Sequence, residues 1–505
     1  MSTRALSLLV FVAGMCSLAT EMAGARLLAP YFGTSNLVWA NVIGLILLYL
    51  SLGYWLGGRL ADRHPTGRAL GRVVLVAAVS IAALPFLSRP LFGAAADAFD
   101  QVSAGAYVAS FIGTMLLFAV PVTALGAVTP WAVRLGVRDI TEAGAVSGRL
   151  YALSTVGSIA GTFLPVLVLI PAIGTQRTLL AAAALLAAAA ALTQPRTLAV
   201  APFVLAALLL IPPGQVKGAT DGTVVFEGES QYQYVQVVRE PSGDTVLHLN
   251  EGWAIHSVLP ARGPLTDGYW DAFLGLPLLS DAPRGRLAVL GNAGGTVGNL
   301  YEFGWPAVTI DGVEIDPLVT EAGRRWLGMR NPRLTVHTAD ARFWLRGAQS
   351  TFDAIVVDAY RQPYIPFHLA SREFFELARD RLAPRGVVAI NIGTPPGRTA
   401  IMTRIAQTMR AVFPSVHEWR FDDFNSIVVG YRASTSVAAA QAMLGRATGV
   451  AARPAKAMAA GLRDVPPGPA GDVLTDDHAP VEWLTDGALL TYLREGAPGA
   501  RRGGS

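Results

Sequence analysis

Acidic residues stand at the ends of successive predicted strands in the middle of this chain. The first strand, residues 286–291, runs into the glycine-rich loop 291–295, and the next three strands end at or just before Glu314, Asp340 and Asp358. Glycines let the backbone approach a ligand closely, and an acidic residue after the second strand can accept hydrogen bonds from two ribose hydroxyls. The carboxyl ends of parallel strands share one edge of a sheet, so the pattern predicts a nucleoside site at that edge.

The elements that must hold these residues alternate between strands and helices. Beyond Asp358 we expect helices at 371–381 and 396–411 and strands at 386–392, 415–420 and 425–431. Such alternation indicates an α/β fold with a parallel, doubly wound, Rossmann-like sheet of the class I methyltransferase-like type. Residues 223–258 instead alternate in polarity and are rich in β-forming residues, which predicts a small β-hairpin layer before the sheet. A linking helix is expected at 267–276.

The first part of the chain is strongly apolar. The whole sequence is 52% hydrophobic and only 15% charged, with a mean hydropathy of +0.42. A membrane span needs about 20 apolar residues. Seven apolar segments predict an α-helical transmembrane bundle in the lipid bilayer, namely 5–29, 38–58, 70–88, 106–128, 150–172, 178–194 and 197–213. Within them, Gly53 and Gly57, and likewise Gly157 and Gly161, have a spacing that favours close helix packing.

Basic residues in the loops give an orientation. Arg59 to Arg72 follow the second segment and Arg134 to Arg149 separate the fourth from the fifth, so these loops and the N-terminus are expected in the cytoplasm. Seven crossings then place the C-terminal half outside, whereas nucleoside chemistry is expected in the cytosol. The sequence predicts a multi-pass cell-membrane protein and leaves the side of its C-terminal half open.

The remaining polar residues exclude some classes of function. Cys16 is the only cysteine, and no spacing of histidine, cysteine and carboxylate residues suggests a metal site. No basic surface interleaved with aromatic residues argues for nucleic acid, and a homo-oligomer is left open. Glu21 and Arg26 lie in or near the first apolar segment, where they would line a polar path or form a pair that fixes helix packing.

These patterns divide the chain into four parts. Residues 1–214 form the transmembrane domain, and 215–280 the hairpin layer with its linking helix. Residues 281–435 form the nucleoside-binding, Rossmann-like catalytic domain. Residues 436–505 are a C-terminal tail rich in alanine, glycine and proline. We expect 433–470 to be loose after a helix, and the sequence is polar and patterned again at 474–482, where Asp476 and Asp477 would either reach the site or cap a helix.

Six short motifs in this order resemble the spermidine synthase (polyamine aminopropyltransferase) family, in a membrane-fused bacterial form. They lie between about residues 220 and 435, namely Glu-Ser-Gln-Tyr-Gln ending at Gln233, Leu-Asn-Glu-Gly ending at Gly252, Gly-Asn-Ala-Gly-Gly ending at Gly295, Val-Glu-Ile-Asp around Glu314, Ala-Asp-Ala-Arg around Asp340, and Val-Asp-Ala-Tyr-Arg-Gln-Pro around Asp358. The resemblance implies transfer of an aminopropyl group from decarboxylated S-adenosylmethionine to a small-molecule amine, with no permanently bound cofactor.

The resemblance also implies roles for individual residues. Asp358 matches the catalytic aspartate, Glu314 the ribose-binding acid and Asp340 the residue that meets the adenine amino group. Gln233 matches a glutamine of the nucleoside site, and Tyr269 a tyrosine that lines the amine site. Gly291 and Gly295 belong to the nucleoside loop, and Tyr360 lies where a loop could cover the amine.

The sequence departs from the family at the amine and donor ends. Gly294 stands where the family has an aspartate that holds the donor's amino group, and Trp270 stands in place of a glutamine. Arg361 and Gln362 replace a second aspartate. These changes predict altered amine specificity.

Other interpretations of these residues and of the chain remain open. Glu314 and Asp340 would also suit helix caps, before Pro317 and Ala341 respectively. The same sheet could serve a methyltransferase that uses S-adenosylmethionine itself. A third hypothesis is a non-catalytic nucleoside or polyamine sensor, or a transporter, in which the membrane part carries the function.

Overall fold

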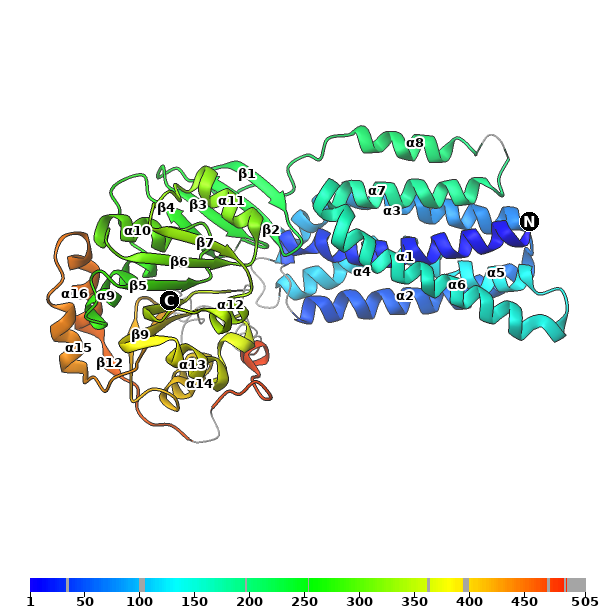
Figure 1. The fold of residues 1–505 in the computed structure, drawn as a ribbon. Helices are drawn as coiled ribbons and strands as arrows, with labels where there is room; N and C mark the ends of the chain where they lie inside the picture. The colour runs from blue at the N-terminus through cyan, green and yellow to red at the C-terminus, as the bar shows by residue number, and fades with distance from the viewer. Residues whose placement is uncertain are drawn as a thin grey trace, which may run out of the picture. The chain divides into compact units, whose positions relative to one another are not determined.

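The computed structural model describes residues 1–32, 36–99, 105–195, 198–252, 254–360, 364–393, 399–469, 473–485 and 487. The chain divides into two compact units (Figure 1). The first unit comprises Met1–Gly218 together with Glu229–Tyr234, and the second comprises Ala219–Gly228 and Val235–Ser505.

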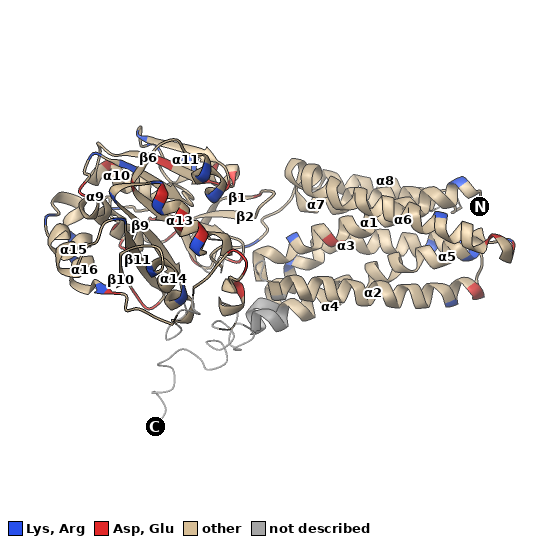
Figure 2. Cartoon of the chain, turned by 60° about the horizontal axis from the view of Figure 1, so that its bottom comes forward, with Lys and Arg blue, Asp and Glu red and all other residues tan. Residues whose placement is uncertain are grey.

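The first unit is a bundle of apolar helices. Its α-helices are α1 (Thr3–Phe32), α2 (Asn36–Arg63), α3 (Gly67–Phe99), α4 (Gly105–Gly126), α5 (Val128–Gly136), α6 (Ala143–Leu164), α7 (Ile170–Ala191) and α8 (Ala201–Ala207). The shorter helical turns are η1 (Ile140–Glu142), η2 (Pro165–Leu169) and η3 (Leu208–Leu210). Figure 2 shows that few charged residues interrupt these helices between their ends, as expected for segments that lie in hydrocarbon.

The structure differs from the expected seven spans. Five stretches of the described residues are long and apolar enough to cross a membrane, namely Thr3–Phe32, Val38–Arg63, Gly67–Ala94, Ser110–Gly136 and Ile140–Ala191. The last one contains the predicted fifth segment and most of the sixth, and its backbone leaves helical geometry at Gly174, with φ 81° and ψ 166°. The predicted seventh is a shorter apolar helix, Ala201–Leu210. Ten residues rise only about 15 Å, half of a hydrocarbon core of about 30 Å.

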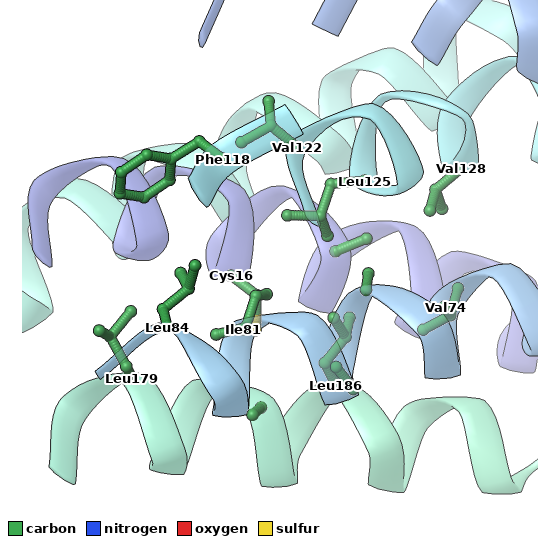
Figure 3. Close-up of a cluster of buried hydrophobic side chains, with 14 of the residues drawn as sticks. Cys16, Val74, Ile81, Leu84, Phe118, Val122, Leu125, Val128, Leu179 and Leu186 are labelled. Carbon is green, nitrogen blue, oxygen red and sulfur yellow. The ribbon is translucent and has the colours of Figure 1, made fainter. Parts of the chain in front are cut away.

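Small residues bring the helices of this bundle together. A Cβ on Gly157 would meet the backbone oxygen of Phe11, and one on Gly53 would meet that of Thr123. The predicted packing role of these glycines is therefore confirmed. Larger side chains fill the remaining interior, and Figure 3 shows Cys16 of α1 among leucine, isoleucine, valine and phenylalanine side chains from the neighbouring helices. Such close packing is what holds helices together where no water is displaced between them.

The second unit contains two sheets. The smaller has the order β1-β2-β3-β4, from β1 (Thr223–Glu229), β2 (Tyr234–Arg239), β3 (Thr245–Leu249) and β4 (Ile255–Leu259). The larger has the order β12-β10-β11-β9-β8-β5-β6-β7, from β5 (Arg286–Leu290), β6 (Thr309–Glu314), β7 (Leu334–Thr338), β8 (Phe352–Val357), β9 (Leu382–Gly393), β10 (Ser415–Arg420), β11 (Asn425–Tyr431) and β12 (Arg463–Asp464).

The central strands of the larger sheet are parallel, and strands β10, β11 and β12 extend it in antiparallel pairing. From β5 the chain first builds outward through β6 and β7, then returns to place β8 on the other side of β5 and continues to β9. The strand order therefore reverses between β5 and β8. Open α/β sheets bind ligands beyond the carboxyl ends of the strands at this switch point.

Alternation along the strands gives the sheet two apolar faces. Leu287 and Val289 of β5 belong to one buried cluster, and Ala288 and Leu290 belong to the other. Helices α9 (Leu276–Leu279), α10 (Thr296–Gly304), α15 (Val437–Leu444) and α16 (Ala452–Gly461) supply the first cluster. Helices α12 (Ala341–Gly347), α13 (Arg372–Asp380) and α14 (Ala400–Arg410) supply the second. This doubly wound arrangement confirms the predicted fold class.

Two local expectations need correction. The linking helix is mainly a 3-10 segment, η4 (Tyr269–Gly275), which continues into α9. Residues 437–464 are not a loose tail, because α15, α16 and β12 are ordered parts of the domain. Their composition is rich in alanine, but Leu444, Ala455 and Met458 are fully buried against the sheet, and this burial favours helix over coil.

Candidate functional site

The glycine loop after β5 lies at the switch point. Gly291 has φ +90°, and a Cβ there would meet the backbone of Ala359 at 2.6 Å, just after β8. Only glycine combines this conformation with so close an approach of two chain segments. Gly295 has φ +91° and begins α10 as its N-cap residue. The two predicted loop glycines therefore set the turn that joins the sheet edge to α10.

Glu314 ends β6 and holds this loop. Its side chain is buried, with Oε2 accepting from the Ala293 amide at 2.9 Å and Oε1 from the Asp316 amide at 3.0 Å. Burial raises the pKa of Glu314 to about 7, although these amide bonds oppose the rise. Asp316, not Glu314, caps α11 (Pro317–Trp326), because its side chain accepts from the Leu318 amide. The cap interpretation of Glu314 was therefore wrong.

Asp358 follows β8 on the other side of the switch point. Its carboxylate accepts hydrogen bonds from the Tyr269 hydroxyl at 3.0 and 3.2 Å and from the Asn391 side-chain amide at 3.1 Å. The indole of Trp270 is a further donor to it, and the rings of Tyr269 and Trp270 stack with centroids 4.2 Å apart. Burial raises the pKa of Asp358 to about 6, and the three donors limit that rise.

Tyr360 lies next to this group without a hydrogen bond to Asp358. Its hydroxyl donates to the Asn391 backbone oxygen at 3.0 Å and accepts from the Gly393 amide at 2.6 Å. Tyr360 therefore fixes the end of β9, and burial raises its pKa. Sequence reasoning missed both Asn391 and the contact of Trp270. The one available signal was the position of Asn391 near the end of a predicted strand.

Asp340 is a helix cap with a second neighbour. Its Oδ1 accepts from the Phe343 amide at 2.8 Å, so it begins α12 as the alternative interpretation expected. Its Oδ2 lies 3.5 Å from the His368 ring. Arg342 on the same helix makes two hydrogen bonds to Asp476, at 2.7 and 2.6 Å. Asp476 thus joins the C-terminal segment to the start of α12.

Three further residues singled out in the sequence are Gln233, Arg361 and Gln362. Gln233 lies in the turn Glu229–Tyr234, which groups with the first unit, whereas the residues above belong to the second. Arg361 and Gln362 lie outside the described residues.

The surroundings of Gly294 explain one departure from the family pattern. Its amide donates to the Ser257 hydroxyl at 2.8 Å, and a Cβ there would collide with the Leu327 side chain and lie 3.0 Å from the Ser257 Cβ. Leu327 and Ser257 therefore fill the space that a side chain at this position would need. No group of histidine, cysteine and carboxylate side chains suited to a metal ion occurs in the described part of the chain.

The fold and the acidic groups at its switch point define a doubly wound α/β domain with a ligand-binding edge. Residues 267–421 match the family described as the Spermine/spermidine synthase domain. The C-terminal part of the chain therefore contains a spermine/spermidine synthase domain.

Curated relatives agree with this assignment. A protein of Bifidobacterium longum named "Probable polyamine aminopropyl transferase" is 32% identical over 216 residues, covering 42% of this chain and 48% of that protein. The polyamine aminopropyltransferase of Nitrosomonas europaea is 32% identical over 160 residues, which cover 30% of this chain and 48% of that protein. The chain thus spans about half the length of these relatives.

Among solved structures, the spermidine synthase of Thermotoga maritima is similar to 42% of this chain at 21% sequence identity. The similarity covers 73% of that structure, with a TM-score of 0.35.

Proposed function

We propose that this protein is a membrane-bound aminopropyltransferase, which moves an aminopropyl group from decarboxylated S-adenosylmethionine to an amine in polyamine biosynthesis. The spermine/spermidine synthase domain and the names of the similar proteins support the reaction class. The five apolar helical stretches support a place in the membrane.

The hydrogen-bonded carboxylate of Asp358 carries the proposal. An amine attacks only after it loses a proton, and a general base is most effective when its pKa lies near the working pH. With a pKa raised to about 6 by burial, Asp358 is ionised at pH 7 yet more basic than an ordinary aspartate. Tyr269, Trp270 and Asn391 fix its orientation.

The proposed reaction is one displacement. The amine nitrogen forms a bond to the carbon next to the sulfonium, and the bond from that carbon to sulfur breaks. The electron pair of the broken bond stays on sulfur, so methylthioadenosine leaves as a neutral thioether. The nitrogen's surplus proton passes to Asp358 and then to water.

The remaining predicted residues would bind the nucleoside and the amine. Glu314 would accept hydrogen bonds from the ribose hydroxyls, with the backbone of Gly291 and Gly295 beside it. Asp340 and Gln233 would contact the nucleoside. Tyr269 and Tyr360 would line the amine site, where they adjoin Asp358.

A product assay tests this proposal. The purified full chain in detergent or nanodiscs is incubated with decarboxylated S-adenosylmethionine and an amine, and the products are identified by mass spectrometry. Methylthioadenosine together with an aminopropylated amine is expected. If neither forms with putrescine, cadaverine or spermidine as acceptor, the proposal is wrong.

One observation favours a second candidate, a methyltransferase on the same sheet. Gly294 itself supplies no carboxylate for a donor's amino group, and Leu327 and Ser257 fill the space around it, which favours a donor with a different tail. The same assay with S-adenosylmethionine as donor separates the two candidates, because a methyltransferase releases S-adenosylhomocysteine.

A further inference from the structure

The side-chain amide of Asn391 lies beside the proposed base, Asp358, and the contact between them fixes which end of the amide points toward it. Asn391 is near the end of β9, is 3% exposed, and its Nδ2 lies 3.1 Å from Asp358 Oδ1. An ionised carboxylate can only accept hydrogen bonds, so the amide must present its NH₂ group to Asp358. Its oxygen, Oδ1, consequently faces away from that contact.

This oxygen is a buried acceptor without a donor. In the part of the chain that the structure describes, Asn391 Oδ1 has no hydrogen-bond partner. The two nearby hydroxyls cannot supply one, because the Tyr269 proton is shared with Asp358 and the Tyr360 proton is donated to the Asn391 backbone oxygen. Buried polar atoms are rarely left unpaired in folded proteins, so each exception needs an explanation, and a role in catalysis is one of them.

We propose that Asn391 Oδ1 accepts an N–H of the amine substrate, so that Asn391 and Asp358 together hold the attacking nitrogen. This inference rests on the proposed function and assigns Asn391 a direct contact with the substrate. The two acceptors differ in chemistry, because a carboxylate can take the proton whereas a neutral amide oxygen only holds an N–H. Asn391 would therefore keep the nitrogen in place while Asp358 deprotonates it.

The arrangement favours a primary amine over a tertiary one. A protonated primary amine offers three N–H groups, enough for both acceptors, whereas a protonated tertiary amine offers one. Replacing the hydrogens of the amine by methyl groups leaves one N–H for two acceptors. When that N–H goes to Asp358, the buried Asn391 Oδ1 stays unpaired, which is the costly outcome.

Calorimetry on full-length protein saturated with methylthioadenosine tests the inference. Putrescine, cadaverine and n-butylamine are titrated into wild type and into Asn391→Leu. For every amine that the wild type binds, the variant is expected to bind at least tenfold more weakly. The affinity for methylthioadenosine should change less than twofold. Equal amine affinity would overturn the inference.

Two comparisons keep the test sharp. Asn299→Leu is the matched control, because Asn299 also has an unpartnered Oδ1 but donates its NH₂ to the Leu327 backbone oxygen; amine binding should not change. If Asn391→Leu does not fold, the wild type alone tests the inference. N,N-dimethylbutylamine should then bind at least tenfold more weakly than n-butylamine. If n-butylamine does not bind, the N,N-dimethyl form of the diamine that binds is compared with that diamine in the same way. Equal binding of the methylated compound would overturn the inference.

The outcomes separate the inference from the proposed function. Asn391-dependent amine binding without release of methylthioadenosine would overturn the proposed function and leave the inference standing. Turnover combined with equal amine affinity in wild type and Asn391→Leu would overturn the inference and leave the proposed function standing. A wild-type protein that binds none of the amines would overturn the inference whatever its turnover.

Discussion

Two carboxyl groups at the ligand-binding edge of the sheet, the buried Glu314 and the half-buried Asp358, both have pKa values raised by desolvation, but they have different partners. Glu314 is bound by backbone amides of the glycine loop and of the next helix. Asp358 is bound by side chains, which substitution can remove one at a time. Side-chain substitutions therefore cannot remove the amide donors to Glu314, whereas substitution of the neighbouring side chains can change the pKa of Asp358.

Glu314→Gln should weaken binding of methylthioadenosine by about 1–3 kcal/mol, because a charged acceptor is lost. The raised pKa adds a pH dependence. Glu314 becomes protonated as the pH falls through about 7, so wild-type affinity should decrease there, while the glutamine variant should show no such decrease. Calorimetry between pH 6 and 8 measures both effects, and unchanged affinity in the variant would remove Glu314 from the nucleoside site.

Asp358→Asn should lower turnover by about 10²–10⁴-fold and leave nucleoside binding intact, since a positioned base contributes about that much. In the wild type, kcat/KM should fall as the pH drops below about 6, where Asp358 is protonated. Full activity in the variant would show that another group takes the proton.

Stability supplies the control for this variant. The pKa of Asp358 is raised from 3.8 to about 6, so its ionisation costs folding stability progressively between these values and fully above them. Removing that charge should therefore not lower the thermal midpoint at pH 8. A lower midpoint would mean that the lost turnover reflects unfolding.

Among the larger elements, the C-terminal segment is fixed to α12 and α13. Leu474 and Val481 are buried, and Asp476 accepts from Arg342 and, at 2.5 Å, from the Ser371 hydroxyl at the start of α13. The side chain of Arg342 is 12% exposed and that of Asp476 42%, so the pair is partly shielded from water.

Asp476→Asn should lower the free energy of unfolding of the domain by about 1–2 kcal/mol, because the largely buried Arg342 loses its charged partner. Methylthioadenosine should also bind less tightly, since Asp340 stands at the start of the same helix. Thermal unfolding and calorimetry measure these effects. The neighbouring exposed Asp477, changed to asparagine, is the control, and an equal effect there would show that the ion pair has no special role.

The sequence correctly predicted the elements that are determined by the local pattern of apolar and polar residues. The alternating residues of β5 and the carboxylates after β6 and β8 carry their own signal, so the sheet edge was predicted. Asn391 and Trp270 carry no charge pattern, and their contacts with Asp358 depend on chain segments far apart. The same holds for α15 and α16, where burial against the sheet outweighed an alanine- and glycine-rich composition.

At the scale of the whole molecule, the break at Gly174 determines how many crossings the proposed membrane location would involve. It divides Ile140–Ala191 into two helical stretches, the second of about 17 residues, the lower limit for a span. The ten-residue helix Ala201–Leu210 is too short to cross. Six crossings, instead of the seven expected from the sequence, would return the chain to the side on which it began.

Reporter fusions after Arg72, after Gly105 and at the C-terminus should therefore lie inside, outside and inside. The first two follow from the positive-inside rule and the third from the even number of crossings. A C-terminal reporter that lies outside would show that residues 197–213 do cross. It would also separate the domain from a cytosolic pool of its proposed substrates.

The pairing of Arg342 with Asp476 also has a consequence for the order in which the protein is made. The two residues are 134 positions apart, and the ribosome adds the aspartate near the end of the chain. The Asp340 cap can begin α12 earlier in synthesis, but the Arg342 side chain has to wait for Asp476. A chain cut short before Asp476 would therefore lack this carboxylate, and Arg342 would keep its hydrogen bond to the His368 backbone oxygen.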